Sequence, residues 1–295
     1  MHGAWILRSV EVVVDGRPGL LVLKGEDLSA AYPGMVRYTL EFRRGEDVLY
    51  TYRTNTYEYP PGTSQTAESV ALTAFHRLRQ ELPDRPEAFV LHPPEPAVGP
   101  LPLRAPSTAV VLQGSPRQHG NSAILAGWTT DACRDAGLRC ETLCPAEMRI
   151  EECTGCFRCY NAGRCVIDDD MVAIYRTLAA VGLVIVCTPV YAETVPAALK
   201  AVIDRCQAYR ARRLLTGGES GRQAGILCAV SGQVGAENFV CVSRVAGSFF
   251  RLIGAEMLGE VLVDGADAVN DIRTVAGKEE GVRAELRALI SRVAD

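Results

Sequence analysis

Cysteine is absent from the first 132 residues, although the whole chain of 295 residues contains eleven. No apolar run reaches the length that crosses a membrane, and the chain does not open on the charged, apolar and small-residue segments of a signal peptide. Basic residues are not in excess, since 31 Lys and Arg stand against 35 Asp and Glu. We therefore expect a cytoplasmic protein without a membrane or nucleic-acid partner, whose cysteines serve as thiols or ligands rather than disulfides.

A proline-rich stretch divides the chain. Residues 92–107, HPPEPAVGPLPLRAPS, hold six of the sixteen prolines and show no periodicity, which is typical of an extended linker. Before it, alternating β-rich runs are followed by residues 64–82, where apolar side chains recur at helical spacing after a Ser64 cap. Residues 1–91 are therefore predicted to form a small α+β domain of unknown role, an antiparallel sheet with one covering helix.

Strands and helices alternate strictly beyond the linker. Short apolar strands are predicted at 108–114, 139–144, 182–188, 223–230 and 256–264, and the helices that follow them at 121–137, 169–181, 195–214, 236–255 and from about residue 275. The strands are apolar throughout, as expected where both faces of a sheet are covered. This order predicts an α/β fold with a doubly wound parallel sheet over residues 108–295.

The loop after the first of these strands lacks two common nucleotide-binding motifs. Residues 114–122, GSPRQHGNS, do not match G-x-G-x-x-G, which argues against a Rossmann dinucleotide loop, or G-x-x-x-x-G-K-[ST], which excludes an NTPase loop. The loop enters a helix N-terminus, whose free amide groups suit a phosphate. Ser115, Asn121 and Ser122 can donate hydrogen bonds, and Arg117 supplies one cation. A mononucleotide phosphate site is predicted, and the alternative is a polar turn before a capped helix.

Three segments taken together resemble a known superfamily. They are GSPRQHGNS after the first strand, CTGCFRCYNAGRCVIDDDM after the second and TPVYAETVPAALKAVIDR after the third. Their order is that of the NADPH-dependent FMN reductase superfamily, and they are most similar to its iron–sulfur flavoprotein branch. The resemblance covers about residues 108–265 and does not extend to residues 1–105. It implies a flavodoxin-like fold with strand order 2-1-3-4-5 and FMN across the carboxyl ends of the strands.

The resemblance also implies where FMN binds. The segment after the first strand holds the phosphate, the segment after the third lines the isoalloxazine ring, and SGQVG at 231–235 closes over the ring. The implied FMN-binding residues are Ser115, Pro116, Arg117, Asn121, Ser122, Pro189, Val190, Tyr191, Ser231, Gly232, Gln233 and Gly235. For Tyr191 the alternative is a packing role. No residue stands out as a general acid or base, which is consistent with chemistry that belongs to the cofactors.

Four cysteines fall within thirteen residues, at Cys153, Cys156, Cys159 and Cys165. A C-x2-C-x2-C run brings three thiolates to one compact soft site and a fourth closes it, so a single [4Fe–4S] cluster is the predicted occupant. Two alternatives remain: structural zinc, which usually takes two well-separated pairs, and a loop without metal that holds disulfides or free thiols. The other seven cysteines fall mostly at apolar positions and are predicted to be core residues.

Together these features predict an oxidoreductase or electron-transfer flavoprotein dependent on FMN and [4Fe–4S], which passes electrons from NAD(P)H or a ferredoxin-like donor to a small-molecule or protein redox partner. The first alternative is a cluster-free NAD(P)H-dependent FMN or quinone reductase. The second, of another class, is an iron–sulfur redox sensor that acts through residues 1–91. Helix 236–255 is more apolar than one surface-covering helix requires, so we expect it to take part in a homodimer or homotetramer.

Overall fold

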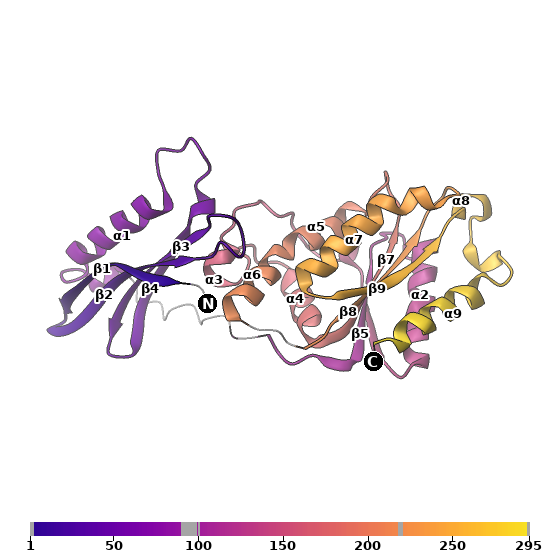
Figure 1. Cartoon of the computed structure of the whole chain (residues 1–295), viewed down its shortest axis with the longest axis horizontal. Helices are drawn as coiled ribbons and strands as arrows, with labels where there is room; N and C mark the ends of the chain where they lie inside the picture. Colours follow the sequence, from indigo (N-terminus) through magenta and orange to yellow (C-terminus); the bar gives the residue numbers. More distant parts are fainter. Residues whose placement is uncertain (1–2, 90–98, 100, 218–220, 294–295) are drawn as a thin grey trace. The chain divides into compact units, whose positions relative to one another are not determined.

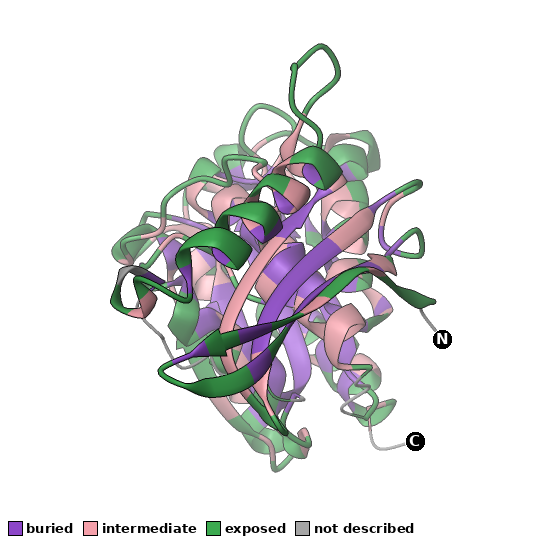
Figure 2. Cartoon of the chain, turned by 90° about the vertical axis from the view of Figure 1, so that its left-hand side faces the viewer, coloured by how far each residue is buried: buried purple, intermediate pink, exposed green. Residues whose placement is uncertain are grey.

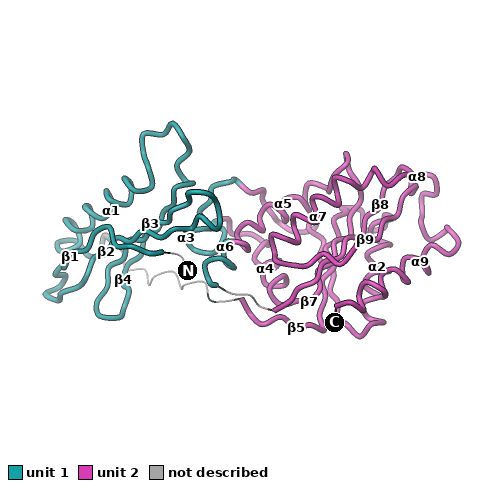
Figure 3. The backbone as a smooth tube through the Cα atoms, in the orientation of Figure 1, with its two compact units in different colours: residues 1–100, 154–166, 211–217 teal, residues 101–153, 167–210, 218–295 magenta. Residues whose placement is uncertain are grey.

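The structure is a computed structural model that describes residues 3–89, 99, 101–217 and 221–293. The described residues fall into two compact units, which Figure 3 colours separately. Unit 1 takes its residues from 1–100, 154–166 and 211–217, and unit 2 takes its residues from 101–153, 167–210 and 218–295. Residues 92–98 and 100 of the predicted linker lie outside the described residues, and its last three residues, 105–107, form the beginning of a strand of unit 2. The predicted domain boundaries stay predictions.

Unit 1 is built on a four-stranded antiparallel sheet in which each strand pairs with the next along the chain. Its strands are β1 (Ala4–Val14), β2 (Arg17–Asp27), β3 (Val36–Arg44) and β4 (Asp47–Asn55). Asp15 and Gly16 join β1 to β2 with φ angles of 52° and 69°. This is the two-residue hairpin geometry that an Asp-Gly pair favours. The antiparallel sheet predicted before the linker is therefore present.

One helix, α1 (Ala67–Glu81), packs on this sheet. It begins after Thr66, which forms a capping box with Ser69, so the cap lies two residues beyond the predicted Ser64. Phe75 and Leu78 of α1 are buried in one apolar core with residues of the strands. Figure 2 shows the exposed outer side of α1 and the buried residues along the strands.

Unit 2 contains a five-stranded parallel sheet in the order β6-β5-β7-β8-β9. Its strands are β5 (Ala105–Gln113), β6 (Arg139–Leu143), β7 (Val181–Pro189), β8 (Ala224–Val230) and β9 (Glu256–Val263). The first of them along the chain, β5, lies between the second and the third, which confirms the predicted flavodoxin-like order 2-1-3-4-5. Every residue of β7 and β8 is buried, because helices cover both faces of the sheet.

The helices of unit 2 form a layer on each face of this sheet (Figure 1). One layer contains α2 (Asn121–Asp135) and α9 (Lys278–Ser291), and the other contains α4 (Met171–Ala180), α5 (Ala197–Arg205) and α7 (Val240–Ile253). The short helices α3 (Cys159–Ala162) and α8 (Ala266–Val269) lie within loops. None of the helices that the structure describes is both long enough and apolar enough to cross a bilayer.

The helix predicted at 195–214 is not continuous. It breaks at Cys206 into α5 and α6 (Gln207–Thr216). The Tyr175 hydroxyl donates to the Arg205 carbonyl oxygen at 2.7 Å, and that oxygen is the acceptor a continuous helix would offer to the amide of residue 209. A side chain from α4 therefore hydrogen-bonds to the backbone at the point where the helix breaks.

Helix α7 uses most of its large apolar side chains inside unit 2. Val242, Phe249 and Phe250 have no exposed surface, whereas Val240, at the start of the helix, is 48% exposed. The apolar excess that suggested a contact between copies is thus largely accounted for by the core of this unit. The predicted homo-oligomer stays a prediction.

Candidate functional site

The loop between β5 and α2 offers unprotected amide groups to an anion. Gly120 is the N-cap of α2 and provides no side-chain cap for the first amides of that helix. Arg117 is exposed, and its amide donates to the Ser115 hydroxyl oxygen at 3.1 Å. The Ser115 hydroxyl hydrogen stays available for donation, because the oxygen acts only as an acceptor in this contact. A helix N-terminus with a nearby guanidinium fits a phosphate.

Two further residues predicted for the phosphate lie at the start of α2. Ser122 is buried. Asn121 is already engaged: its Oδ1 accepts from the Ile272 amide at 3.0 Å, and its Nδ2 donates to the Asn270 carbonyl oxygen at 3.3 Å. This side chain therefore ties the beginning of α2 to the segment after α8. Its predicted contact with FMN is untested, as are the contacts predicted for Ser122 and for the exposed Pro116.

The segment after β7 forms a tight turn that leaves Tyr191 partly exposed. Pro189 is the buried last residue of β7, and the Val190 amide donates to the Val230 carbonyl oxygen at 2.8 Å. Tyr191 and Thr194 exchange backbone hydrogen bonds of 2.8 and 2.9 Å across the turn. The Tyr191 side chain is 38% exposed. It is therefore not a core residue, and it can meet a ligand at this edge of the sheet.

The segment after β8, residues 231–235, is held by the segment after β9. The buried Ser231 donates its amide to the Val263 carbonyl oxygen at 2.8 Å, and the Gly235 amide donates to the Asp264 carboxylate at 2.9 Å. A Cβ atom at Gly232 would collide with the Asp267 carboxylate, so a side chain does not fit there without a shift. Gln233, the fourth predicted residue of this segment, is exposed. Sequence reasoning missed both Asp264 and Asp267, because nothing in their local pattern points to a loop 29 or more residues earlier.

These three segments follow β5, β7 and β8, which are neighbours in a parallel sheet. They therefore emerge at the same edge, the carboxyl edge, where open α/β sheets bind their ligands. The structure thus brings the predicted FMN-binding segments to one edge of unit 2.

The four clustered cysteines are free thiols. Cys153 is exposed, and Cys156, Cys159 and Cys165 are half-buried. Gly155 and Phe157 have φ angles of 65° and 55°, so the chain turns sharply between the first and third of them.

The four clustered cysteines supply donors that suit a cluster better than a single metal ion. Among the described residues, no three His, Cys, Asp or Glu side chains are gathered for a single metal ion. Four thiols in one short loop nevertheless fit the chemistry of an iron–sulfur cluster, whose ligands bind different iron atoms and so do not need to meet at one point. The residues present therefore fit a cluster by donor type, and the structure does not gather them for a single ion.

A buried ion pair holds the two ends of the cysteine segment in unit 2. Arg205 donates to both carboxylate oxygens of Asp169, at 2.7 and 2.9 Å, and the two side chains are 1% and 0% exposed. The Arg205 guanidinium also donates to the carbonyl oxygens of Glu151 and Ile167, at 2.8 and 3.3 Å. Glu151 precedes the four cysteines and Ile167 follows them, so one guanidinium fastens both stems of the segment.

The hydrogen bonds around Asp169 keep its carboxyl group ionised. Burial alone would raise the pKa of Asp169, but the hydrogen bonds from Arg205 and from the amides of Glu151 and Met171 lower it below its ordinary value. Nothing in the sequence indicates that Arg205 pairs with Asp169, because Asp169 is one of three consecutive aspartates and lies 36 positions away.

The remaining cysteines differ in burial. Cys133, Cys187, Cys206 and Cys228 are buried, as predicted for core residues, whereas Cys241 is exposed. Burial raises the pKa of Cys187 and of Cys206, which keeps these thiols protonated. They are poorly suited to be metal ligands.

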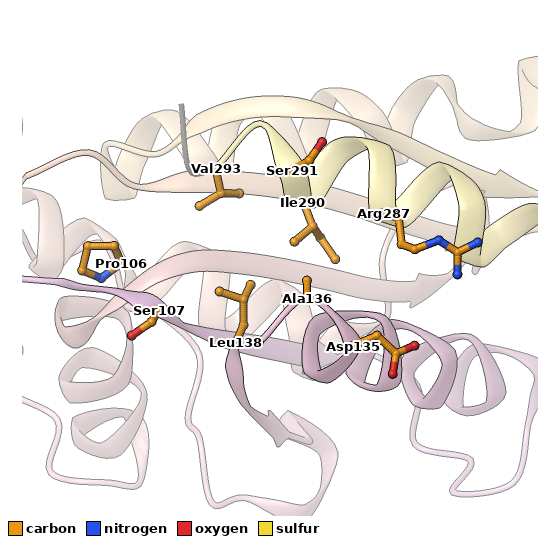
Figure 4. Close-up of a pocket in the computed structure, with 10 residues that line it drawn as sticks. Pro106, Ser107, Asp135, Ala136, Leu138, Arg287, Ile290, Ser291 and Val293 are labelled. Atoms are coloured by element: carbon orange, nitrogen blue, oxygen red, sulfur yellow. The ribbon is translucent and has the colours of Figure 1, made fainter.

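A cavity of about 630 Å³ lies elsewhere in unit 2 (Figure 4). It is lined by the beginning of β5, the end of α2 with the turn after it, and the last turns of α9: Pro106, Ser107, Asp135, Ala136, Gly137, Leu138, Arg287, Ile290, Ser291 and Val293. It contains none of the predicted site residues.

Comparison with known proteins agrees with the fold. The family model described as NADPH-dependent FMN reductase matches residues 108–264, just over half of the chain, and the chain belongs to this family. An iron-sulfur flavoprotein of Methanosarcina thermophila is 35% identical over 94 residues, which is 32% of this chain and 49% of that protein. Another, of Archaeoglobus fulgidus, is 35% identical over 109 residues, which is 37% of this chain and 50% of that protein. The resemblance to the iron–sulfur flavoprotein branch is confirmed, although the chain spans only about half the length of these relatives.

A solved structure was also similar. The NAD(P)H:quinone oxidoreductase from Methanothermobacter marburgensis is 15% identical with a TM-score of 0.47, and the match covers 64% of this chain and 96% of that one.

Proposed function

We propose that this chain is an oxidoreductase dependent on FMN and a [4Fe–4S] cluster, which passes electrons from NAD(P)H or a ferredoxin-like donor to a small-molecule or protein acceptor. FMN, when bound, takes up a hydride's two electrons and releases them singly, and the cluster carries one electron at a time. The observation that carries the proposal is the set of four free thiols in one loop. The chain enters that loop from the carboxyl end of β6, the neighbour of β5.

The phosphate of FMN would be held by groups of the loop after β5. The uncapped amides at the start of α2 and the Arg117 guanidinium supply positive potential. Ser115 supplies a hydroxyl donor whose oxygen is already oriented by the Arg117 amide. These groups recognise a charged phosphate rather than a neutral sugar chain, which supports FMN over riboflavin.

The isoalloxazine ring would lie along the carboxyl ends of β7 and β8. Tyr191 offers a partly exposed aromatic side chain there, and the turn behind it is closed by two backbone hydrogen bonds. Residues 231–235 are fixed by hydrogen bonds to the segment after β9. Preformed walls of this kind lower the ordering cost of binding a rigid planar ring.

The cluster would be held by Cys153, Cys156, Cys159 and Cys165. This ligand assignment is tested by measuring the iron, sulfide and flavin content per chain in protein purified without air. We expect iron and sulfide in the wild type and loss of iron in each of the four Cys→Ser variants. The matched control is Cys228→Ser, which replaces a buried thiol of β8 and should keep the iron. Four variants that all retain wild-type iron would overturn the ligand assignment.

Two other readings give different results in the same preparation. A cluster-free reductase would bind FMN and turn over NAD(P)H without iron. A redox sensor would contain iron but would not sustain turnover with any added acceptor. Sustained NAD(P)H oxidation by protein that contains both cofactors favours the proposed function over both alternatives.

We also propose that the protein is a homodimer or homotetramer. Measurement of its mass in solution tests this proposal.

A further inference from the structure

The middle of the cysteine loop is packed within unit 1. Residues 154–166 belong to that unit. The ring of Phe157 lies 5.1 Å from the ring of Tyr32 and 5.0 Å from that of Tyr57. Tyr160 is fully buried in the same aromatic group, 5.5 Å from Tyr32. Aromatic side chains from the first hundred residues therefore anchor the loop.

A polar network joins the end of β4 to the same loop. Asn55 has no exposed surface, and its Nδ2 donates to the Phe157 carbonyl oxygen at 3.2 Å and to Asn161 Oδ1 at 2.8 Å. Asn161 Nδ2 donates in turn to Glu58 Oε1 at 2.7 Å. The Asn161 carbonyl oxygen accepts from Arg37 Nη1 at 3.1 Å. Two asparagines that are 106 positions apart thus hold each other and the loop backbone in a buried site.

We propose that Asn55 and Asn161 are positioning residues for the cluster ligands, and that the N-terminal sheet is the platform on which the cysteine loop takes its shape. The inference rests on the proposed cluster function. It gives a role to residues 1–91, which the family match does not cover.

The network acts on the backbone between two ligands. Phe157 lies between Cys156 and Cys159, and its φ of 55° is in the left-handed region that a bulky residue adopts only where its surroundings impose it. The Asn55 side chain fixes the carbonyl group of this residue. Asn161 lies two residues after Cys159, and its hydrogen bonds with Arg37, Asn55 and Glu58 fix the backbone on the other side of that ligand. The directions in which the two thiols leave the backbone are thereby set.

Replacement of Asn55 would leave a buried polar atom without its donor. Asn161 Oδ1 would lose the bond from Asn55 Nδ2, and the Phe157 carbonyl oxygen would keep the Tyr160 amide, which donates to it at 3.0 Å, but lose Asn55. A loop that can relax would leave this conformation. Residues that orient metal ligands from behind typically change metal affinity by about 10- to 100-fold when they are replaced. We therefore expect cluster loss to be at least about tenfold faster without the Asn55 amide donor.

The test uses the full chain purified without air. Asn55→Ser keeps a side-chain oxygen that can accept from the Tyr57 amide, as Asn55 Oδ1 does at 3.0 Å, but it lacks the amide donor that reaches the loop. Asn161→Ala removes the other half of the contact. Thr51→Val is the matched control in the same strand, β4, since the Thr51 hydroxyl oxygen is buried without a hydrogen-bond partner among the described residues and takes no part in the network. Each protein is assayed for iron and flavin per chain, rate of iron loss to a ferrous chelator, and cluster reduction potential.

The inference predicts rapid iron loss and a shifted potential in both asparagine variants, normal flavin content in both, and wild-type values in the control. It also predicts that the effects of the two substitutions on iron loss are not additive, because the hydrogen bond between Asn55 and Asn161 is already lost in each single variant. Wild-type iron retention and potential in both asparagine variants would overturn the inference and leave the proposed function standing. Loss of flavin together with iron would also count against it, since the fault would then be general. A wild type that takes up no iron would remove the proposed function itself.

Discussion

At the scale of single residues, Arg117 provides the sharpest test of the flavin phosphate. Arg117→Ala removes one charge-assisted interaction of about 1.5–3 kcal/mol, which corresponds to a roughly ten- to hundredfold weaker affinity for FMN. The affinity for riboflavin, which has no phosphate, should not change. Titration of flavin fluorescence measures both. Arg134→Ala, at the other end of α2 and 64% exposed, is the control and should change neither affinity. Equal binding of FMN and riboflavin by the wild type would contradict the phosphate assignment.

The pair of Arg205 and Asp169 makes a different prediction, about stability. Asp169→Asn leaves the buried guanidinium without its counter-charge and should lower the free energy of unfolding by about 3–5 kcal/mol at neutral pH. Asp204→Asn is the control. It breaks the partly exposed pair with Lys200 and should cost less than about 1 kcal/mol. Chemical denaturation of the two variants measures the difference.

The same pair predicts a dependence on pH. The folded protein holds the pKa of Asp169 below its ordinary value, so the contribution of the carboxylate is complete above that ordinary value. It is lost as the pH falls through the lower pKa of the folded state. The stability gap between wild type and Asp169→Asn should therefore narrow in acid and stay constant near neutral pH. A gap that widened in acid would mean that the carboxylate is not stabilised by its partner.

At the scale of elements, the turn after β7 places two non-glycine residues in the left-handed region of backbone conformation, which lowers the stability of the folded state. Ala192 and Glu193 have φ angles of 45° and 64° between the paired Tyr191 and Thr194. This region costs an L-residue roughly 1–2 kcal/mol, and Asn-Gly is the pair best suited to it. Replacing both residues, Ala192→Asn with Glu193→Gly, should raise the free energy of unfolding by about 1 kcal/mol. Asp15→Asn in the β1–β2 turn is the control, because its Asp-Gly pair already suits the geometry. No gain in thermal or chemical denaturation would show that the turn is not strained.

The elements of the parallel sheet were predictable from local pattern. Strands β7 and β8 are apolar at nearly every position because both faces are buried, and strict alternation with helices restricts the topology. Element ends were less predictable. The cap of α1 is Thr66 rather than Ser64, and the helix predicted at 195–214 breaks at Cys206, where a hydroxyl from another helix donates to the Arg205 carbonyl oxygen. A contact between two helices that are distant in sequence does not change the apolar periodicity of either helix, so the periodicity does not predict it.

The candidate site divides in the same way. The segments predicted to bind flavin follow strands, so their common edge follows from strand order. The contacts that support the site do not follow from strand order. Asn55 and Asn161 look like ordinary turn residues in the sequence, and their hydrogen bond forms only because the chain brings together residues that are 106 positions apart. Asp264, which holds the Gly235 amide, was missed for the same reason. Local composition therefore points to candidate cofactor residues, whereas the residues that hold them in place emerge only from the folded structure.

At the scale of the whole molecule, the two units should respond differently to removal of the first hundred residues. The residues assigned to FMN and the two apolar cores of the parallel sheet all belong to unit 2. Most of the cysteine loop belongs to unit 1, and it loses its packing partners when the first hundred residues are removed. A chain that begins at Leu101 should therefore bind FMN with unchanged affinity but take up much less iron than the full chain. Flavin titration and iron assay of the same preparation measure both, with the full-length protein as the reference. Full iron content in the shortened chain would show that the loop does not need its platform, and loss of FMN would show that unit 2 does not fold without the first hundred residues.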